Sequence, residues 1–417
     1  MRNSFAFLNP ILLFGGEGSM KKKIISFVAA VAMTAGMVFA GGSKDASAKA
    51  PAFKVGVIYI GDENEGYTEA HMRGIAEMKK TLGLSDAQLI EKKNIPEDEK
   101  CYDAAVDLAE QGCTLIFANS FGHEDYMIQA AKEYPKIQFC HATGYQAAKS
   151  GLPNMHNFFC AVYESRYVSG VVAGLKLNQM IKDGAVAANK CKIGYVGAYP
   201  YAEVVSGYTS FFLGVRSVCP TATMEVRYTN SWADMTLEKE TAEALIADGC
   251  VLISQHADTT GAPTACEAHK VPCVGYNVDM ISVAPDAALT SAALNWGAYY
   301  KDAGVLAKAG KTIPTDWCKG YADKAVLITP VNTKIAAPGT QAQVDKTIAA
   351  IKSGKLKVFD TGKFTVGGKK IEDLIASGGD WAKYAAYVKD GYFHESELIS
   401  APAFDLRIDG ITELTAK

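Results

Sequence analysis

The sequence has little excess of either charge and few long apolar runs. Its 417 residues include 42 lysines and arginines against 45 aspartates and glutamates, which gives a formal net charge of -3 at pH 7. No basic cluster stands out, so we expect neither a nucleic-acid partner nor a polybasic contact with a membrane surface. Beyond residue 40 the chain also lacks an apolar stretch long enough to span a membrane.

Paired metal-ligand spacings are missing as well. The stretch ISQHADTTGAPTACEAHKVPC (253–273) gathers histidine, aspartate and cysteine residues, but a structural zinc site usually draws on short spacings such as CxxC. Cys266 and His269 fall on one predicted helix, whereas His256 and Cys273 fall in the strands before and after it. These positions lie at different ends of a strand–helix–strand unit, so we predict no metal site here.

Nucleophile motifs are also absent. Neither Ser120 nor Ser254 stands in the GxSxG turn of a hydrolase, and no cysteine–histidine pair has a local signature. His141 could act as a base, and carboxylates such as Asp258 and Asp279 could act as acid and base. Such carboxylates more simply accept hydrogen bonds from the amino or hydroxyl groups of a bound molecule. We therefore expect a binding protein, not an enzyme, and no cofactor.

The N-terminal forty residues contain the one long apolar run. From Met20 the chain reads MKKKIISFVAAVAMTAGMVFA, in which three lysines precede the run, and Val38 and Ala40 take the -3 and -1 positions of a cleavage site. This layout predicts a secretory signal peptide, with residues 1–19 upstream of the true start, and a flexible leader at 41–52. No cysteine lies near the cleavage site, so there is no lipoprotein box and we expect a free periplasmic protein.

Ten cysteines in an exported protein would usually indicate disulfides. Most of them, however, lie inside apolar runs that read as strands, such as GCTLIFA and IQFCHAT. Free cysteine behaves as a small core residue in such a setting. We expect mostly reduced, buried thiols.

The mature chain alternates β-rich runs with amphipathic helical patterns, in two similar series. Alternation of this kind predicts parallel sheets with helical crossovers, the doubly wound α/β class. The runs KVGVIYI and KIGYVGAY begin the two series, which repeat after about 137 residues. We therefore predict two Rossmann-like lobes joined by a hinge. The predicted strands are 54–60, 89–95, 114–120, 137–143, 192–199, 224–229, 251–257 and 271–277, and the predicted helices are 68–82, 99–111, 124–134, 203–217, 236–248 and 262–269.

Ligands of open α/β sheets bind beyond the carboxyl ends of the strands. The residues at those ends are rich in aromatic and amide groups with a few carboxylates, and they lack the Gly-rich loop with lysine, or the arginine pair, that a phosphate would require. This set suits a flat, polar, uncharged ring held between aromatic side chains. The candidate site residues are Asp62, Tyr67, Ser120, Phe121, His141, Trp232, His256, Asp258, Asp279, Asn295 and Trp296.

At these strand ends the sequence resembles the basic membrane protein family of bacterial solute-binding proteins, and in particular its purine-binding branch. The resemblance covers about residues 53–413. The motifs that carry it are GDENEGYTEAH, NSFG, HATGY, YESRYVSGVVAG, FLGVRSVCP, NSW, QHAD, GYNVDM and NWGAYY. It implies the type I periplasmic-binding fold, with 53–160 and 296–325 in one lobe and 161–295 and 326–417 in the other.

The resemblance also implies a function. A monomer would bind a purine nucleobase or nucleoside and pass it to the permease and ATPase subunits of an ABC importer. Tyr67, where this branch usually has tryptophan, would form one wall of the base site and Trp232 the opposite wall. Asp258 and Asp279 would bond amino or hydroxyl groups, while Ser120, Phe121, Asn295 and Trp296 would line the cleft. Three alternatives stay open: a flavin or another heterocycle as ligand, an exported nucleoside hydrolase, and a sensory module for a membrane receptor.

Overall fold

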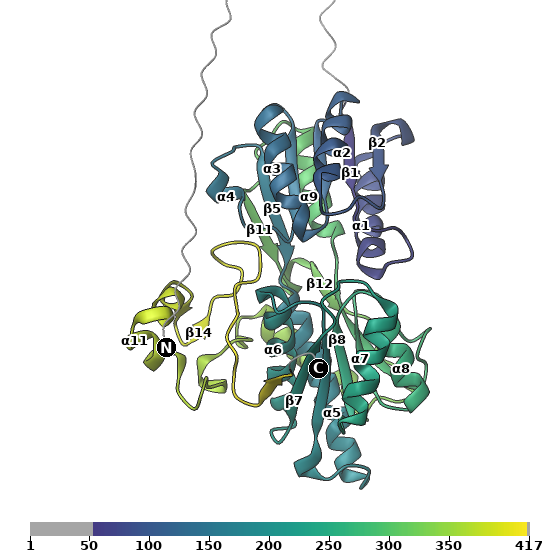
Figure 1. Ribbon diagram of the computed structural model, residues 1–417, viewed down its shortest axis with the longest axis vertical. Coiled ribbons are helices and arrows are strands. Elements are labelled where there is room, and N and C mark those ends of the chain that lie inside the picture. The colour runs from purple at the N-terminus through teal and green to yellow at the C-terminus, as the bar shows by residue number, and fades with distance from the viewer. Residues whose placement is uncertain (1–52, 415–417) are drawn as a thin grey trace, which may run out of the picture. The chain divides into compact units, whose positions relative to one another are not determined.

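The computed structural model describes residues 53–414 (Figure 1). The predicted signal peptide and leader, residues 1–52, lie outside the described residues. Within 53–414, no helix combines the length and the apolar character that crossing a bilayer requires.

The first sheet has six parallel strands in the order β11-β5-β4-β3-β1-β2. Its central strands are short apolar runs that are buried on both faces, as parallel sheets require. Helices α1 and α9 cover one face, and α2 and α3 cover the other. The elements are β1 (Val55–Ile58), α1 (Gly66–Leu82), β2 (Leu89–Lys92), α2 (Glu99–Glu110), β3 (Leu115–Ala118), α3 (Glu124–Glu133), β4 (Gln138–Ala142), α4 (Ala147–Ser150), β5 (Met155–Cys160), α9 (Gly297–Lys308) and β11 (Asp316–Lys319).

The second sheet has seven strands in the order β12-β10-β9-β8-β6-β7-β15, and only β12 runs antiparallel among those described. Helices α5 and α6 pack together on one face, and α7 and α8 lie on the other. The elements are α5 (Val162–Lys182), β6 (Lys192–Gly197), α6 (Ala202–Arg216), β7 (Thr223–Tyr228), α7 (Met235–Ala247), β8 (Leu252–His256), α8 (Gly261–His269), β9 (Cys273–Tyr276), β10 (Ala288–Leu294), β12 (Val326–Ile328), α10 (Thr340–Lys352) and β15 (Ile411–Glu413).

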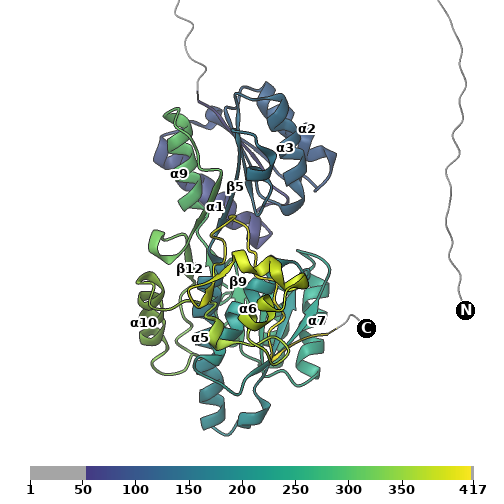
Figure 2. The same ribbon diagram turned by 90° about the vertical axis from the view of Figure 1, so that its left-hand side faces the viewer.

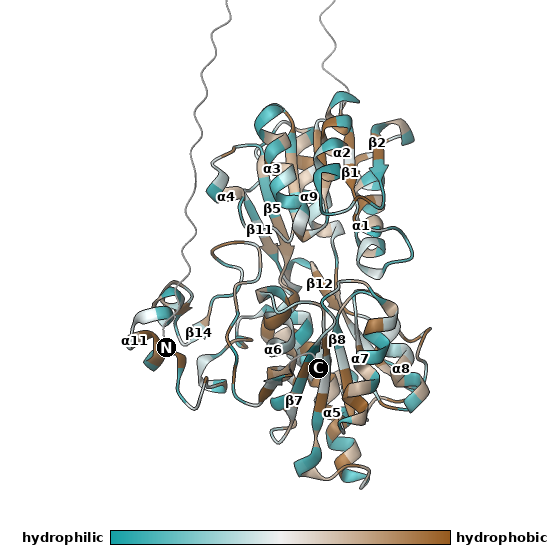
Figure 3. Cartoon of the chain, viewed as in Figure 1, coloured by the Kyte–Doolittle hydropathy of each residue, from teal (hydrophilic) through white to brown (hydrophobic). Residues whose placement is uncertain are grey.

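The two sheets repeat one strand order. The order β2-β1-β3-β4-β5 of the first sheet matches β7-β6-β8-β9-β10 of the second, so the predicted α/β class with parallel sheets is confirmed. Each predicted strand and helix is present, with ends that differ by at most three residues. The expected lobe boundaries near residues 160, 295 and 325 fall in the connections β5–α5, β10–α9 and β11–β12. Figure 3 shows hydrophobic colouring along many strands, with hydrophilic colouring on the outer turns of α2 and α3.

The C-terminal segment, residues 359–414, was not divided into elements from the sequence. It contains α11 (Ile371–Ala376), the hairpin of β13 (Val388–Lys389) and β14 (Tyr392–Phe393), and β15 at the edge of the second sheet. Figure 2 shows it in yellow, in front of α6 and β9. This segment contacts elements of both lobes. Ser400 donates two 2.9 Å hydrogen bonds to Asp316 of β11, in the first sheet. Glu395 accepts a hydrogen bond from Ser206 of α6, which packs on the second sheet.

All ten cysteines are free thiols in the structure. Nine are buried, and Cys318 is half-buried. Burial raises the pKa of the Cys140 thiol to about 12. These cysteines therefore pack as small core residues, as their apolar surroundings in the sequence indicated.

Candidate ligand-binding site

A cavity of about 290 Å³ lies beyond the carboxyl ends of strands from both sheets. Strands β1, β3 and β4 contribute from the first sheet, and β6, β7, β8 and β9 contribute from the second. This is the position at which open α/β sheets bind ligands, and the volume is close to that of small-molecule pockets, about 300–1,000 Å³. The lining residues are Ile60, Gly61, Glu65, Tyr67, Glu97, Asn119, Ser120, Phe121, Thr143, Tyr199, Glu203, Ser231, Trp232, Ala233, Asp258 and Tyr276.

Five of the lining residues are aromatic, and they come from elements and loops around both sheets. Trp232 follows β7 and lies edge-on to Tyr199, with ring centroids 5.3 Å apart. Tyr67 is in the first turn of α1, and its hydroxyl donates to the backbone carbonyl of Asn119. Behind it lies Trp296, perpendicular at 6.0 Å. Tyr67 and Trp232 thus line the same cavity. Their role as opposing walls of a bound ring stays a prediction.

Four carboxyl groups also line the cavity: Glu65, Glu97, Glu203 and Asp258. Asp258 follows β8, and its side chain accepts a 2.8 Å hydrogen bond from Asn277. Burial raises the pKa of Asp258, and the nearby Glu65, Glu238 and Glu203 raise it further. Burial raises the pKa of Glu203 to about 7, although the nearby Arg166 partly opposes this increase. The cavity therefore offers several hydrogen-bond acceptors, and one of them, the Glu203 carboxyl, is partly protonated near neutral pH.

The other two carboxylates are already engaged with the backbone. Glu65 caps the N-terminus of α1 and accepts from the Tyr67 and Thr68 amides, at 2.6 and 2.8 Å. Glu97 accepts from the Ser120 hydroxyl at 2.6 Å, and from the backbone amide of Gly122 at 2.7 Å. These bonds fix the loops after β1 and β3, and they leave fewer acceptor positions free for a ligand than the carboxyl count implies.

One buried cation lies near these acids without lining the cavity. The Arg166 guanidinium sits 3.8 Å from the ring centroid of Tyr276, and it donates a 2.6 Å hydrogen bond to the Gln255 carbonyl. It favours the ionised forms of Glu203 and Asp258, so it lowers the pKa of each and partly offsets burial. No lysine, arginine or histidine is among the lining residues in the described part of the chain. The site thus suits neutral or cationic molecules rich in hydrogen-bond donors.

The predicted site residues divide into two groups. Tyr67, Ser120, Phe121, Trp232 and Asp258 line the cavity. The remaining six lie elsewhere around it, and their part in ligand binding stays a prediction.

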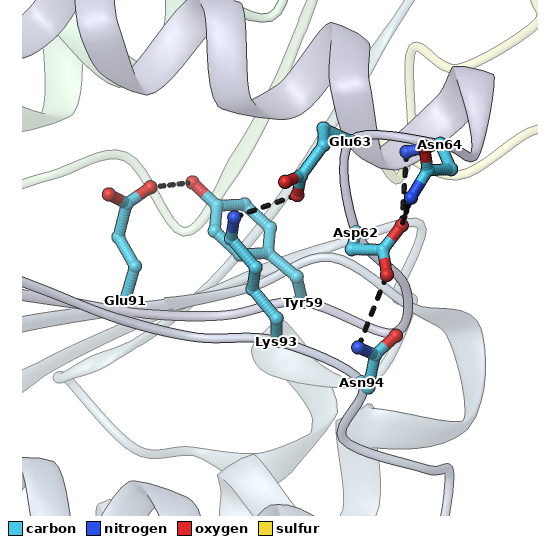
Figure 4. Close-up of polar contacts among 7 residues, drawn as sticks. All are labelled: Tyr59, Asp62, Glu63, Asn64, Glu91, Lys93 and Asn94. Carbon is cyan, nitrogen blue, oxygen red and sulfur yellow. Dashed lines mark hydrogen bonds and ion pairs between the residues drawn. The ribbon is translucent and has the colours of Figure 1, made fainter.

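Asp62 holds the loop that follows β1 (Figure 4). One of its carboxylate oxygens accepts from the backbone and side-chain amides of Asn64 at 3.0 and 2.9 Å, and the other accepts from Asn94 at 3.3 Å. These bonds lower the pKa of Asp62. Beside it, Lys93 forms a 2.8 Å ion pair with Glu63. The carboxylate therefore stabilises the loop that carries Gly61 to the cavity.

Both predicted histidines are buried next to lining residues. His141, in β4, donates a 2.6 Å hydrogen bond from Nε2 to the Ser120 carbonyl. His256 ends β8, and its Nε2 lies 3.4 Å from a Glu203 oxygen. Burial lowers the pKa of each imidazole. The two rings therefore lie next to Ser120 and Glu203 as neutral groups behind the cavity surface.

The last three predicted residues serve the fold around the cavity. Asp279 is exposed and caps a turn by accepting from the Ile281 amide at 2.9 Å. Asn295 donates to the Lys324 carbonyl at 2.8 Å. Trp296 is fully buried and stacks on His71, with ring centroids 4.0 Å apart.

The cysteine and histidine residues of 253–273 are dispersed. Cys266 and Cys273 are buried in the core under α7 and α8. His269 ends α8 with its side chain about half exposed, near Glu243. This stretch therefore contributes Asp258 to the cavity, while its thiols pack in the core.

Solved structures share this fold. A solute-binding protein of an ABC transporter system from Aeropyrum pernix matches with a TM-score of 0.61 and 14% identity, over 78% of this chain and 96% of that one. One from Conexibacter woesei matches with a TM-score of 0.56 and 22% identity, over 73% and 98%. Identities this low establish the fold alone, which is that of the periplasmic solute-binding proteins.

A fold and a cavity of this kind are found in the substrate-binding proteins of ABC transporters. Such proteins bind a small molecule and work with the other transporter components. The family model described as ABC transporter substrate-binding protein PnrA-like matches residues 52–358. The chain belongs to this family, the Bmp family of ABC transporter substrate-binding proteins.

Three curated relatives carry names that state a ligand. A purine-binding protein of Brucella abortus is 33% identical over 368 residues, 86% of this chain and 98% of its own length. TsgA13 of Haloferax volcanii, named for glucose binding, is 31% identical over 58% of each chain. The nucleoside-binding protein BmpA of Lactococcus lactis is 24% identical, over 63% of this chain and 73% of its own.

Proposed function

We propose that this protein binds a purine nucleobase or purine nucleoside in the cavity and delivers it to the permease of an ABC importer. The observation that carries the proposal is a cavity lined by five aromatic rings and four carboxyl groups, with no basic side chain among its lining residues. A purine has apolar faces that stack on aromatic rings, and its N–H groups and any ribose hydroxyls donate to carboxylates. The names of the Brucella and Lactococcus relatives support the same ligand class.

Individual residues receive roles on this basis. Trp232 and Tyr67 contact the faces of the base from the two lobes. Asp258 and Glu203 accept hydrogen bonds from its amino groups or from ribose hydroxyls. Phe121, at the edge of the cavity, covers the bound ring.

We also propose that the protein acts as a periplasmic monomer, released by cleavage after Ala40 and without a lipid anchor. Intact-mass measurement of the protein recovered from the periplasm tests this. A measured mass equal to that of a chain beginning at Gly41 supports the proposed cleavage. A mass that includes the apolar run from Ile24 contradicts it.

A thermal-shift screen of nucleobases, nucleosides, riboflavin and sugars tests the ligand class. A ligand at a hundredfold excess over its dissociation constant stabilises the folded protein by about 2.7 kcal/mol. This corresponds to a rise in Tm of a few degrees for a chain of this size. We expect purines or their nucleosides to give the largest rise, and isothermal calorimetry to confirm one site per chain.

The alternatives give different results in the same set of experiments. A response to sugars alone would show that the purine assignment is wrong, and a response to riboflavin alone would indicate a flavin site. Incubation with inosine or adenosine separates a binding protein from a nucleoside hydrolase, since only the hydrolase releases free base. Native mass spectrometry of the purified protein would identify a ligand retained from the cell.

A further inference from the structure

A second cavity adjoins the one already described, and we call it the side cavity. Its volume is about 320 Å³, and it shares Phe121, Thr143 and Glu203 with the first cavity. Because three lining residues are common to both, the side cavity begins where the first cavity ends. A ligand longer than a purine ring can therefore extend from one into the other.

The side cavity is mainly aromatic and aliphatic. Tyr145 and Tyr201 stack near the ring of Phe121, with centroids 6.1 and 5.6 Å away and interplanar angles of 27° and 25°. Glu203 is the one charged residue among its lining residues in the described chain. The C-terminal segment, which lies beyond the range of the family model, contributes three further apolar residues: Ile399, Ala401 and Pro402. Such a lining favours an uncharged apolar group.

Thr143 stands at the junction of the two cavities, directly after β4. Its φ angle is 70°, in the left-handed region that a β-branched residue rarely adopts. Its hydroxyl is buried and has no hydrogen-bond partner among the residues the structure describes. Backbone strain and an unpaired buried hydroxyl both cost free energy, and such costs are concentrated at ligand sites. A ligand that passes between the cavities would supply the missing partner.

We propose that the ligand is a purine or purine nucleoside that carries an uncharged apolar substituent, and that this substituent occupies the side cavity. The inference rests on the proposed function and names a narrower ligand class for the same site. Alkyl, arylalkyl and thioether groups fit the lining. A phosphate does not, because the one charged lining residue is acidic.

Calorimetry with matched ligand pairs tests the inference on the full-length mature protein. Adenine is compared with N6-benzyladenine and 9-benzyladenine, and adenosine is compared with 5′-methylthioadenosine. The apolar group is attached at a different position in each of the three substituted ligands. Burial of apolar surface strengthens binding by about fourfold for each methylene group. We expect at least one substituted ligand to bind tenfold or more tightly than its parent.

A substitution in the side cavity provides the second measurement. Ala202→Phe places a bulky ring in the side cavity, and it should remove the preference, so that the affinity ratio of the substituted ligand to its parent falls to one or below. Exposed Ala382→Phe is the matched control and should leave the ratio unchanged. If Ala202→Phe does not fold, the series of ligands on the wild-type protein still decides the matter.

The outcomes separate this inference from the proposed function. Binding of adenine or adenosine without any gain from the three substituents overturns the side-cavity assignment and leaves the purine assignment standing. A gain that persists unchanged in Ala202→Phe also overturns it. Failure of these five ligands, and of every purine and nucleoside in the thermal-shift screen, to bind overturns both.

Discussion

Asp258→Asn should weaken ligand binding and, at the same time, stabilise the unliganded protein. In the wild type, burial and the neighbouring Glu65, Glu238 and Glu203 raise the pKa of Asp258, so ionising this carboxyl costs free energy in the folded state. Asparagine has nearly the same shape and keeps an oxygen that accepts from Asn277, but it carries no charge. The substitution therefore removes the electrostatic cost together with the strongest type of acceptor.

The effect on binding has an estimable size. A hydrogen bond to a charged group contributes about 1.5–3 kcal/mol, so the dissociation constant should rise by about 10- to 150-fold. Because the pKa of Asp258 is raised in the folded state, the substitution should also increase the unfolding free energy at pH 8. A carboxyl whose folded pKa is raised destabilises the protein above its unfolded pKa and has no such effect below it. The gain should accordingly be small at pH 4.

Calorimetry and denaturant unfolding at pH 4 and pH 8 measure the two effects. Asp103→Asn is the matched control, because Asp103 is exposed on α2 and does not line the cavity. It should change neither affinity nor stability appreciably. The reasoning is refuted if Asp258→Asn binds as tightly as the wild type, or if it is less stable than the wild type at pH 8.

Three further outcomes are expected. Trp232→Ala should weaken binding by about 1 kcal/mol or more through loss of ring stacking, while Trp381→Ala, a half-exposed control outside the cavity, should bind normally by calorimetry. The stability of Glu203→Gln relative to the wild type, measured in urea, should rise as the pH rises from about 5 to 7, since burial raises the pKa of Glu203 to about 7 and its ionisation then opposes folding; a constant difference across this range would contradict the assignment. Trp296→Ala should lower the unfolding free energy by about 3–5 kcal/mol, because it empties a fully buried site, and a loss below 1 kcal/mol would not fit the packing described.

Most of the fold could be predicted because its signals are local. Runs such as KVGVIYI alternate with helices whose apolar residues recur at helical spacing, and every such element is present. The C-terminal segment could not be divided in the same way. Its last strand, β15, is stabilised by a distant partner, β7, and no local periodicity encodes that pairing.

The candidate site was predicted in part, for a related reason. Counting residues after each strand found Trp232 and Asp258, but this count does not separate a side chain that points into the cavity from one that supports it, such as Trp296. Glu203 was missed, although the repeat contains the signal. Glu65 and Glu203 each stand eleven residues after the lysine that begins the matching runs, Lys54 and Lys192. Comparing the two halves at that register would have placed a carboxyl group on each side of the site.

The return of the chain to the first sheet has a consequence for how the protein is made. His71 of α1 hydrogen-bonds Tyr300 of α9 at 2.6 Å, across 229 residues of sequence. A ribosome that adds about 5–20 residues per second needs roughly ten seconds or more to cover that distance. The strands β1 to β5 are therefore synthesised well before α9, the second helix that covers this face of their sheet, and the first sheet stays incomplete during that time. Until then its apolar face is open to chaperones and to aggregation.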